Sequence, residues 1–189
     1  FGEMLFTHFG VTGPIILQLS RRASELLAAG QGELELRLNL KPALTHEKLR
    51  ERVERDFATY ERKQLRNAMI DLLPKRLIEP VLNAAGLSPE RFAQQISSKE
   101  RERLVQTLQA LPLTVTGTRP IAEAIVTAGG VATREIDPRT MESKIVKHLY
   151  FVGELVDVDA YTGGYNLQAA FSMGHAAGSY SVWNLEGDK

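Results

Sequence analysis

The spacing of hydrophobic residues changes twice along the chain, and each change predicts a different kind of structure. In Glu33–Asn39 leucines alternate with charged and polar residues, and this period of two predicts a half-buried strand. Across Thr45–Leu111 hydrophobic residues recur every three to four positions, which is typical of helices. Alternation returns in Leu113–Thr118 and, more loosely, in Ile121–Thr127. We therefore expect strands, then helices, then strands again.

Start and stop signals divide the middle of the chain into four or five helices. Thr45 is a good N-cap for the first helix, and a second helix over 63–73 should end at Pro74. A third should end at Gly86. The tripeptides Ser-Pro-Glu at 88–90 and Ser-Lys-Glu at 98–100 each predict a further helix start.

Both ends of the chain carry shorter signals. Met4–Phe6 predicts a short strand, and a helix should open at Pro14 and stop at Gly30. Near the other end, the continuous hydrophobic run Leu149–Val152 predicts a strand buried on both faces. A loop and then a helix over Asn166–Ser179 should follow, with Gly174 and Gly178 allowing close approach of another backbone.

This order of elements predicts a mixed α+β or α/β chain. A β-rich domain at 1–40 plus 111–128 should be interrupted by a helical insertion domain at 41–110. Residues 129–189 should follow as part of an α/β layer. Because one strand and one helix cannot form a doubly wound sheet, and because the chain opens at Phe1, we expect a fragment of a longer protein.

Composition excludes several classes of function. The chain has 189 residues, 43% of them hydrophobic and 24% charged, as in ordinary globular domains. It has no cysteine, which excludes disulfides, thiolate metal sites and cysteine nucleophiles. We expect no membrane segment and no metal site, since neither a long hydrophobic run nor metal-ligand spacing of histidines is present. No signal peptide is visible, so we expect a cytoplasmic protein.

The charge is balanced overall but unevenly distributed. Lys+Arg and Asp+Glu each total 23, yet residues 41–104 hold 14 basic and 10 acidic side chains, and residues 151–189 hold 1 and 5. The basic residues at 48–66 alternate with glutamates at helical spacing, which indicates solvated ion pairs. We therefore expect no nucleic-acid partner. A nucleic-acid-binding module remains the weaker alternative, and it would require steep salt dependence of binding.

The clearest candidate for chemistry follows the predicted buried strand. Glu154 lies at the carboxyl end of that strand, where open α/β sheets bind ligands. Gly163 and Gly164 then lead into a helix whose first N–H groups suit a phosphate, a carboxylate or a carbonyl oxygen. The alternative is an ordinary strand–loop–helix crossover with a glycine turn.

Four segments in order resemble motifs of bacterial NAD(P)/FAD-dependent oxidoreductases of the BaiN/YhiN type. They are Phe6–Leu17, Thr127–Val131, Thr140–Lys144 and Gly153–Gln168. Members of that family begin with a Rossmann half that carries a G-x-G-x-x-G fingerprint, which this chain lacks. The resemblance is therefore to the C-terminal portion of such a flavoprotein: a barrel-like β-rich domain, the helical insertion, and the last strand and helix of the FAD domain.

The resemblance also implies a cofactor, partners and site residues. FAD would be the cofactor, with NAD(P)H as a possible electron donor, a small molecule as substrate, and the N-terminal FAD-domain half as partner. Gly153 and Glu154 would face the ribityl and phosphate region, and Gly163, Gly164 and Asn166 would open a helix aimed at the flavin pyrimidine edge. The remaining cofactor-side candidates are Gly129, Gly130, Asp157 and Tyr165.

His8 is the candidate catalytic residue on the substrate side. An imidazole titrates near neutral pH, so it could exchange a proton beside a hydride transfer. A purely structural histidine is the alternative. For the whole chain the first hypothesis is part of a flavin-dependent oxidoreductase that transfers hydride between a nicotinamide or organic substrate and FAD. The second is a non-catalytic interaction module of helices and strands without cofactor.

Overall fold

The structure, a computed structural model, describes the backbone of residues 1–187 and the side chains through residue 182. By its internal contacts the chain divides into two compact units. We call Gln31–Thr116 the helical unit, and Phe1–Gly30 with the chain from Gly117 onward the split unit. The division into three domains predicted from the sequence stays a prediction.

The helical unit opens and closes with one antiparallel ribbon. Strand β3 (Leu34–Leu38) pairs with β4 (Leu111–Val115), and the register sets Leu34 opposite Val115. The strand predicted at 33–39 is confirmed. Strand β4 begins ahead of Pro112, two residues before the predicted start; Pro112 is tolerated because a two-stranded ribbon leaves each strand a free edge.

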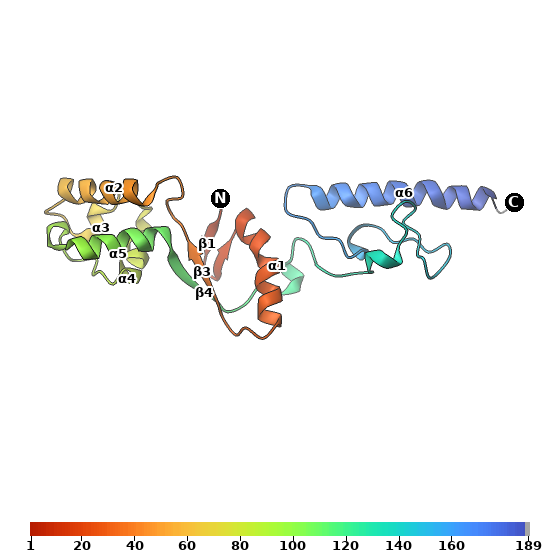
Figure 1. The fold of residues 1–189 in the computed structure, drawn as a ribbon, viewed down its shortest axis with the longest axis horizontal. Coiled ribbons are helices and arrows are strands. Elements are labelled where there is room, and N and C mark those ends of the chain that lie inside the picture. The colour runs from red at the N-terminus through yellow and green to blue at the C-terminus, as the bar shows by residue number, and fades with distance from the viewer. Residues whose placement is uncertain (188–189) are drawn as a thin grey trace. The chain divides into compact units, whose positions relative to one another are not determined.

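Four α-helices follow β3 in the helical unit (Figure 1): α2 (His46–Thr59), α3 (Leu65–Ala68), α4 (Lys75–Ala84) and α5 (Ser98–Gln109). The Thr45 hydroxyl accepts a hydrogen bond from the Lys48 N–H at 3.3 Å, as an N-cap should. A capping box between Ser97 and Glu100 starts α5, one residue before the predicted Ser98.

Two helix predictions in this unit are wrong. The helix expected over 63–73 shortens to α3, because the N–H groups of Leu72 and Leu73 both turn back to the Met69 carbonyl. The tripeptide at 88–90 starts no helix. Instead the Pro89 carbonyl accepts from the Arg66 N–H at 3.1 Å, which keeps this segment bonded to the start of α3; only the 3₁₀ turn Ala93–Gln95 follows.

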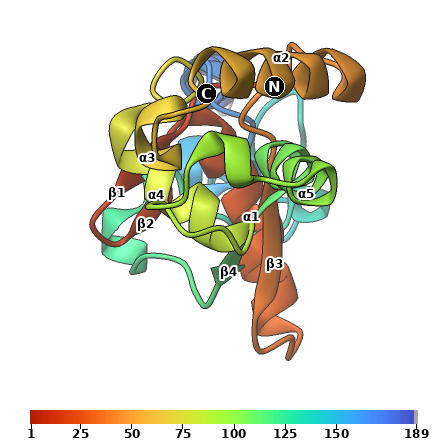
Figure 2. The same ribbon diagram turned by 90° about the vertical axis from the view of Figure 1, so that its left-hand side faces the viewer.

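The core of the helical unit lies between its helices. Helices α2 and α5 pack side by side (Figures 1 and 2). Leu49 and Val53 of α2, and Leu104, Val105 and Leu108 of α5, are all 0% exposed. Hydrophobic residues at helical spacing on both helices thus form one closed layer, as the periodicity predicted.

The split unit begins with a hairpin and a helix. Strand β1 (Leu5–Thr7) pairs antiparallel with β2 (Gly10–Thr12), and α1 (Pro14–Ala28) follows. The strand near Met4–Phe6 and the helix opened by Pro14 are confirmed. The described residues contain two separate two-stranded ribbons and no closed barrel, so the barrel-like domain is not seen in this chain.

The strand predicted at Ile121–Thr127 is wrong. Its place is taken by the 3₁₀ turn Ile121–Glu123 and irregular chain. The turn is supported by the Arg119–Glu123 ion pair at 2.6 Å. No other strand pairs with this segment within the described residues, so its backbone has no ladder to join.

The last part of the split unit packs one long helix, α6 (Tyr165–Gly187), on irregular chain (Figure 1). Its small core holds Ile136, Met141, Val156 and Ala177. Residues 149–152 form no strand, and Leu149 is 40% exposed. The buried strand is therefore wrong for this chain: an inner strand needs neighbours on both sides, and the described residues offer only one bridge, between Glu142 and Tyr150.

Helix α6 confirms the helix predicted at Asn166–Ser179 and extends it. A side chain added at Gly174 or Gly178 would meet nothing within 4 Å, so the close backbone approach expected there is absent from the described structure. None of the helices, over the residues described, is long and hydrophobic enough to span a membrane.

Candidate functional site

The predicted cofactor-side residues gather around the turn at Gly153–Leu155. Val131 bridges Val156 in parallel: its N–H donates to the Leu155 carbonyl at 2.8 Å, and its carbonyl accepts from the Asp157 N–H at 3.0 Å. A Cβ at Gly130 would lie 2.6 Å from the Leu155 oxygen, and Gly130 has φ +145°. Only glycine fits there. The 129–131 and 155–157 segments are thus brought together.

Gly153 connects the same turn to α6. It has φ +65°, and a Cβ placed there would lie 3.7 Å from the Ala170 Cβ on the second turn of the helix. The next residue, Glu154, is exposed and makes no hydrogen bond or ion pair within the described residues. Its carboxylate is therefore available to a ligand at the junction of the turn and the helix.

The start of α6 is a backbone surface with free donors. Gly163 and Gly164 have φ of +128° and +88°, and Gly164 has open space where a Cβ would be. The first bond into the helix runs from the Gln168 N–H to the Gly164 carbonyl at 3.0 Å. The N–H groups of residues 165–167 therefore have no intrahelical acceptor and carry the positive end of the helix dipole.

Asn166 and Tyr165 play different parts at this helix start. The Asn166 amide clamps the preceding loop: its Oδ1 accepts from the Ala160 N–H at 2.7 Å, and its Nδ2 donates to the Ala160 carbonyl at 2.9 Å. It holds the glycine turn in place through the backbone. The Tyr165 side chain is 65% exposed and remains free to cover a ligand.

The side chains of residues 140–144 stabilise the backbone of their own loop. The Ser143 hydroxyl accepts from the N–H groups of Ile145 and Val146 at 3.2 and 3.1 Å, and a Glu142 carboxylate oxygen accepts from the His148 N–H at 2.7 Å. Met141 is held at φ +61° with its side chain in the core. These bonds fix the loop against which α6 packs, and so they help to hold α6 in position.

His8 lies apart from this cluster. It sits on the exposed turn of the β1–β2 hairpin, where its ring meets Phe9 edge-on at 5.1 Å between centroids. No hydrogen bond or ion pair joins it to the glycines within the described part of the chain. The histidine thus remains a candidate by chemistry alone.

One contact was not predicted. Arg21 of α1 donates to the Asp159 carboxylate at 2.5 Å, and so ties α1 to the loop that precedes α6. The sequence shows Arg21 only as an i,i+4 partner of Glu25, and a partner 138 positions away leaves no local signal. No group of three or more potential metal ligands comes together among the described residues.

Two family patterns match this chain. The pattern of the "HI0933-like protein barrel and H2TH domain" matches residues 1–126. The chain belongs to the HI0933-like family. The pattern of the "HI0933-like protein Rossmann domain" matches residues 76–180. This range includes most of α6 and the glycine cluster, by which we mean Gly129, Gly130, Gly153, Gly163 and Gly164. The HI0933-like assignment supports a flavin-type oxidoreductase family with a Rossmann-like domain.

Three curated relatives of this HI0933-like chain show which activities occur among similar proteins. The chain is 35% identical over 92% of its length to the ribosomal RNA dihydrouridine synthase of Escherichia coli. It is 31% identical over 94% to the 3-dehydro-bile acid delta(4,6)-reductase of Clostridium scindens. It is 32% identical over 93% to the ribosomal RNA dihydrouridine synthase of Haemophilus influenzae. It spans 41–43% of the length of these relatives.

Proposed function

We propose that this chain supplies the substrate-side and flavin-facing parts of an FAD-dependent reductase that saturates a carbon–carbon double bond conjugated to a carbonyl. The observation that carries the proposal is the glycine-lined start of α6, joined through Gly153 to the exposed Glu154 and to the Gly129–Val131 segment. Backbone donors in open space beside one free carboxylate suit a flavin ring and its ribityl chain.

FAD, when bound, would supply hydride-transfer chemistry, with NAD(P)H as the electron donor. The chain's own contribution would be electrostatic: the N–H groups of residues 165–167 would stabilise negative charge at the pyrimidine edge of a bound flavin. Glu154 would accept hydrogen bonds from ribityl hydroxyls. Saturation of the double bond also needs a proton at the carbon next to the carbonyl, and His8 is the candidate donor.

The surface of the split unit supports a further partner, the N-terminal half of the FAD domain. Helix α6 carries hydrophobic side chains on more than one face. Its Met173, Ala176 and Ala177 face the small core, whereas Leu167 and Phe171 are 65% and 70% exposed. Sheet strands of a Rossmann half would cover this second face.

The substrate follows from what the named relatives have in common. Dihydrouridine is uridine with its C5=C6 bond saturated, and that bond is conjugated to the C4 carbonyl. A 3-dehydro-bile acid with delta(4,6) unsaturation is likewise a conjugated ketone. We propose uridine in ribosomal RNA as the substrate, because two of the three named relatives act on it by name. A bile-acid-like enone is the second candidate, on the 31% identity to the reductase.

The first test is the visible spectrum of the complete protein as purified, with heat release of its chromophore. Flavin bands and released FAD are expected, and Glu154→Gln should lower FAD retention. Glu79→Gln, the same change at an exposed position of α4, is the matched control and should leave it unchanged. A colourless protein that takes up no added FAD would overturn the proposal.

The second test separates the two substrates. The flavin-loaded protein is incubated with NADPH and unmodified ribosomal RNA, and nuclease digests are analysed for dihydrouridine by mass spectrometry. Dihydrouridine is the expected product. Reduction of a steroid dienone with no dihydrouridine formed would instead select the second candidate.

A further inference from the structure

A groove of about 410 Å³ runs along the surface of the helical unit between α2 and α5. Arg50 and Glu54 line it from α2, and Lys99, Glu102 and Arg103 are among the residues that line it from α5. The groove lies over the closed layer in which Leu49 of α2 and Leu104 of α5 are fully buried. Its walls are therefore two helices that pack on a shared core.

Three of the four basic side chains that line this groove differ from most arginines of the chain in their partners. Arg21, Arg37, Arg52 and Arg91 each contact a carboxylate within 3.2 Å. In contrast, Lys99, Arg101 and Arg103 have no carboxylate partner among the described residues, although all three line the groove. Their positive charge is not neutralised by the protein.

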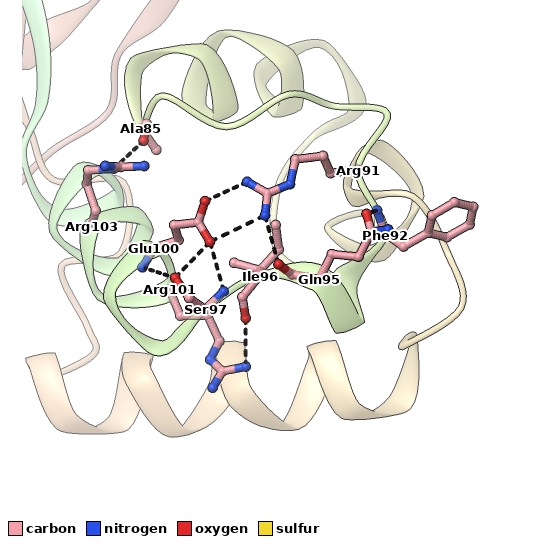
Figure 3. Close-up of polar contacts among 9 residues, drawn as sticks. All are labelled: Ala85, Arg91, Phe92, Gln95, Ile96, Ser97, Glu100, Arg101 and Arg103. Carbon is pink, nitrogen blue, oxygen red and sulfur yellow. Dashed lines mark hydrogen bonds and ion pairs between the residues drawn. The ribbon is translucent and has the colours of Figure 1, made fainter.

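Figure 3 shows how two of these cations are held in place. The Arg101 Nη1 donates to the Ile96 carbonyl at 3.2 Å, and the Arg103 Nε donates to the Ala85 carbonyl at 2.6 Å. A main-chain carbonyl fixes a guanidinium without adding a negative charge that would neutralise it. The Arg101 Nε is buried without a partner among the described residues, so Arg103, which is exposed, offers the more accessible donors. Arg91 in the same view is different, because Glu100 accepts from it at 2.5 Å and neutralises it.

The two acidic residues of the groove already have partners within the protein. Glu54 lies 3.9 Å from the Arg50 guanidinium, and Glu102 accepts from the His46 imidazole at 2.8 Å. Four basic and two acidic side chains line the groove, so it carries an excess of positive charge even before His46 is counted. This local excess fits the 14 basic and 10 acidic residues of 41–104.

We propose that this groove binds the phosphate backbone of the RNA whose uridine the flavin site reduces. The inference rests on the proposed function, and it reverses the expectation of no nucleic-acid partner drawn from the sequence. A fixed guanidinium matches phosphate oxygens. Lys99 and Arg103 are four residues apart on α5, so they share one face of the helix and can contact the same phosphate backbone, whereas Arg101 points elsewhere (Figure 3). Because phosphate contacts carry no sequence information, the groove positions the RNA while the flavin site selects the base.

The test is binding of the flavin-loaded, complete protein to fluorescently labelled, unmodified ribosomal RNA transcripts at several salt concentrations. Lys99→Glu is the first variant, since Lys99 is exposed and makes no bond within the described structure that folding would need. Each lost phosphate contact should reduce the slope of log affinity against log salt by about 0.7–0.9. Lys99→Glu combined with Arg103→Gln should weaken binding roughly tenfold or more near physiological salt.

Arg62→Glu is the matched control. Its charge change equals that of Lys99→Glu and lies in the same unit, but Arg62 is outside the groove and its side chain is 88% exposed. Thermal unfolding checks that Arg103→Gln, which removes the bond to Ala85, leaves the protein folded; Arg103→Lys, which keeps the charge, should restore most of the affinity.

The outcomes separate the groove from the proposed function. If the Lys99 variant binds RNA as tightly as the wild type and with the same salt slope, or if Arg62→Glu weakens binding as much, the groove proposal is overturned while dihydrouridine formation still stands. If the groove variants lose RNA affinity but the wild type forms no dihydrouridine, the groove is supported and the proposed substrate fails.

Discussion

The helical unit and the split unit treat their hydrophobic residues in opposite ways. Among the side chains that the structure describes, 24 hydrophobic residues are buried, of which 20 lie in the helical unit and four in the split unit. Of the 20 large hydrophobic residues that are exposed in this described part, only Ile70 and Phe92 belong to the helical unit. The helical unit therefore holds a core of its own, whereas the split unit has a surface that suits burial against another domain.

This difference indicates two kinds of stability within one chain. A unit with a closed core is stabilised by the burial of its own side chains. A unit with four buried hydrophobic residues gains little in this way and depends on whatever covers it. The residues that we propose to face the flavin lie in the split unit, so cofactor binding and burial by a second domain should be coupled there.

The largest expected effect tests the two cores directly. Leu104→Ala removes a side chain that is 0% exposed and should destabilise the helical unit by about 2–5 kcal/mol, both in this chain and in the complete protein. Phe171→Ala on α6 should change the stability of this chain by less than about 0.5 kcal/mol, because Phe171 is 70% exposed. Denaturant unfolding measures both.

The effect of Phe171→Ala is more informative when it is compared between this chain alone and the protein that also contains the proposed N-terminal half of the FAD domain. If the N-terminal half of the FAD domain covers α6, Phe171→Ala should destabilise the complete protein by about 3–5 kcal/mol, as expected for a buried phenylalanine. If Phe171→Ala has an equally small effect in both proteins, this face of α6 remains exposed. The larger number of exposed hydrophobic residues in the split unit would then need another explanation.

A smaller effect is expected at the glycine cluster. Gly130→Ala places a Cβ 2.6 Å from the Leu155 oxygen at a φ of +145°, and should destabilise the split unit by about 1–3 kcal/mol with loss of bound FAD. Gly117→Ala is the matched control, because a Cβ there meets nothing within 4 Å. FAD retention that survives Gly130→Ala would remove this segment from the cofactor site.

The smallest expected effect is a pH dependence confined to the helical unit. Hydrogen bonds from the Arg91 guanidinium first, and from the Ser97 N–H and hydroxyl, lower the pKa of Glu100 from 4.5 to about 2. The folded state therefore favours the carboxylate. The stabilisation is complete above pH 4.5 and is lost as the pH falls from 4.5 towards 2.

Glu100→Gln tests this dependence. Its Tm should lie below that of the wild type at pH 7, and the difference should shrink between pH 4.5 and 2. Glu79→Gln, on the exposed face of α4, should show no such trend. A constant difference for Glu100→Gln across this range would mean that the Gln side chain disrupts the cap by shape rather than by charge.

Both units contain elements that were predicted well and elements that were predicted wrongly, and the difference between these elements has a physical reason. Thr45 and the Ser97–Glu100 box act within one helix turn, so their effect is visible in the sequence. The run Leu149–Val152 has the composition of an inner strand, but such a strand forms only when its neighbours are present. Tertiary context decides that element.

The same distinction holds for the two candidate sites. The glycines at 130, 153, 163 and 164 could be identified because glycine is the residue that most readily adopts a positive φ, and all four have one. The groove of the helical unit was not, because basic and acidic residues alternate along α2 and α5 in a pattern typical of ion pairs. Only the folded structure shows that the Arg101 and Arg103 side chains turn to carbonyls and leave their charge free.

Because the β3–β4 ribbon brings its two ends together, the helical unit could be inserted or removed as a whole. Leu34 pairs with Val115, so the chain enters and leaves the unit at points about 5 Å apart. A tight turn of two to five residues could join these points without disturbing what lies outside them. Insertion, loss or replacement of the whole unit is therefore a single topological step. Through such a step the proposed RNA-binding groove could be gained or lost while the segment that we propose to face the flavin keeps its sequence.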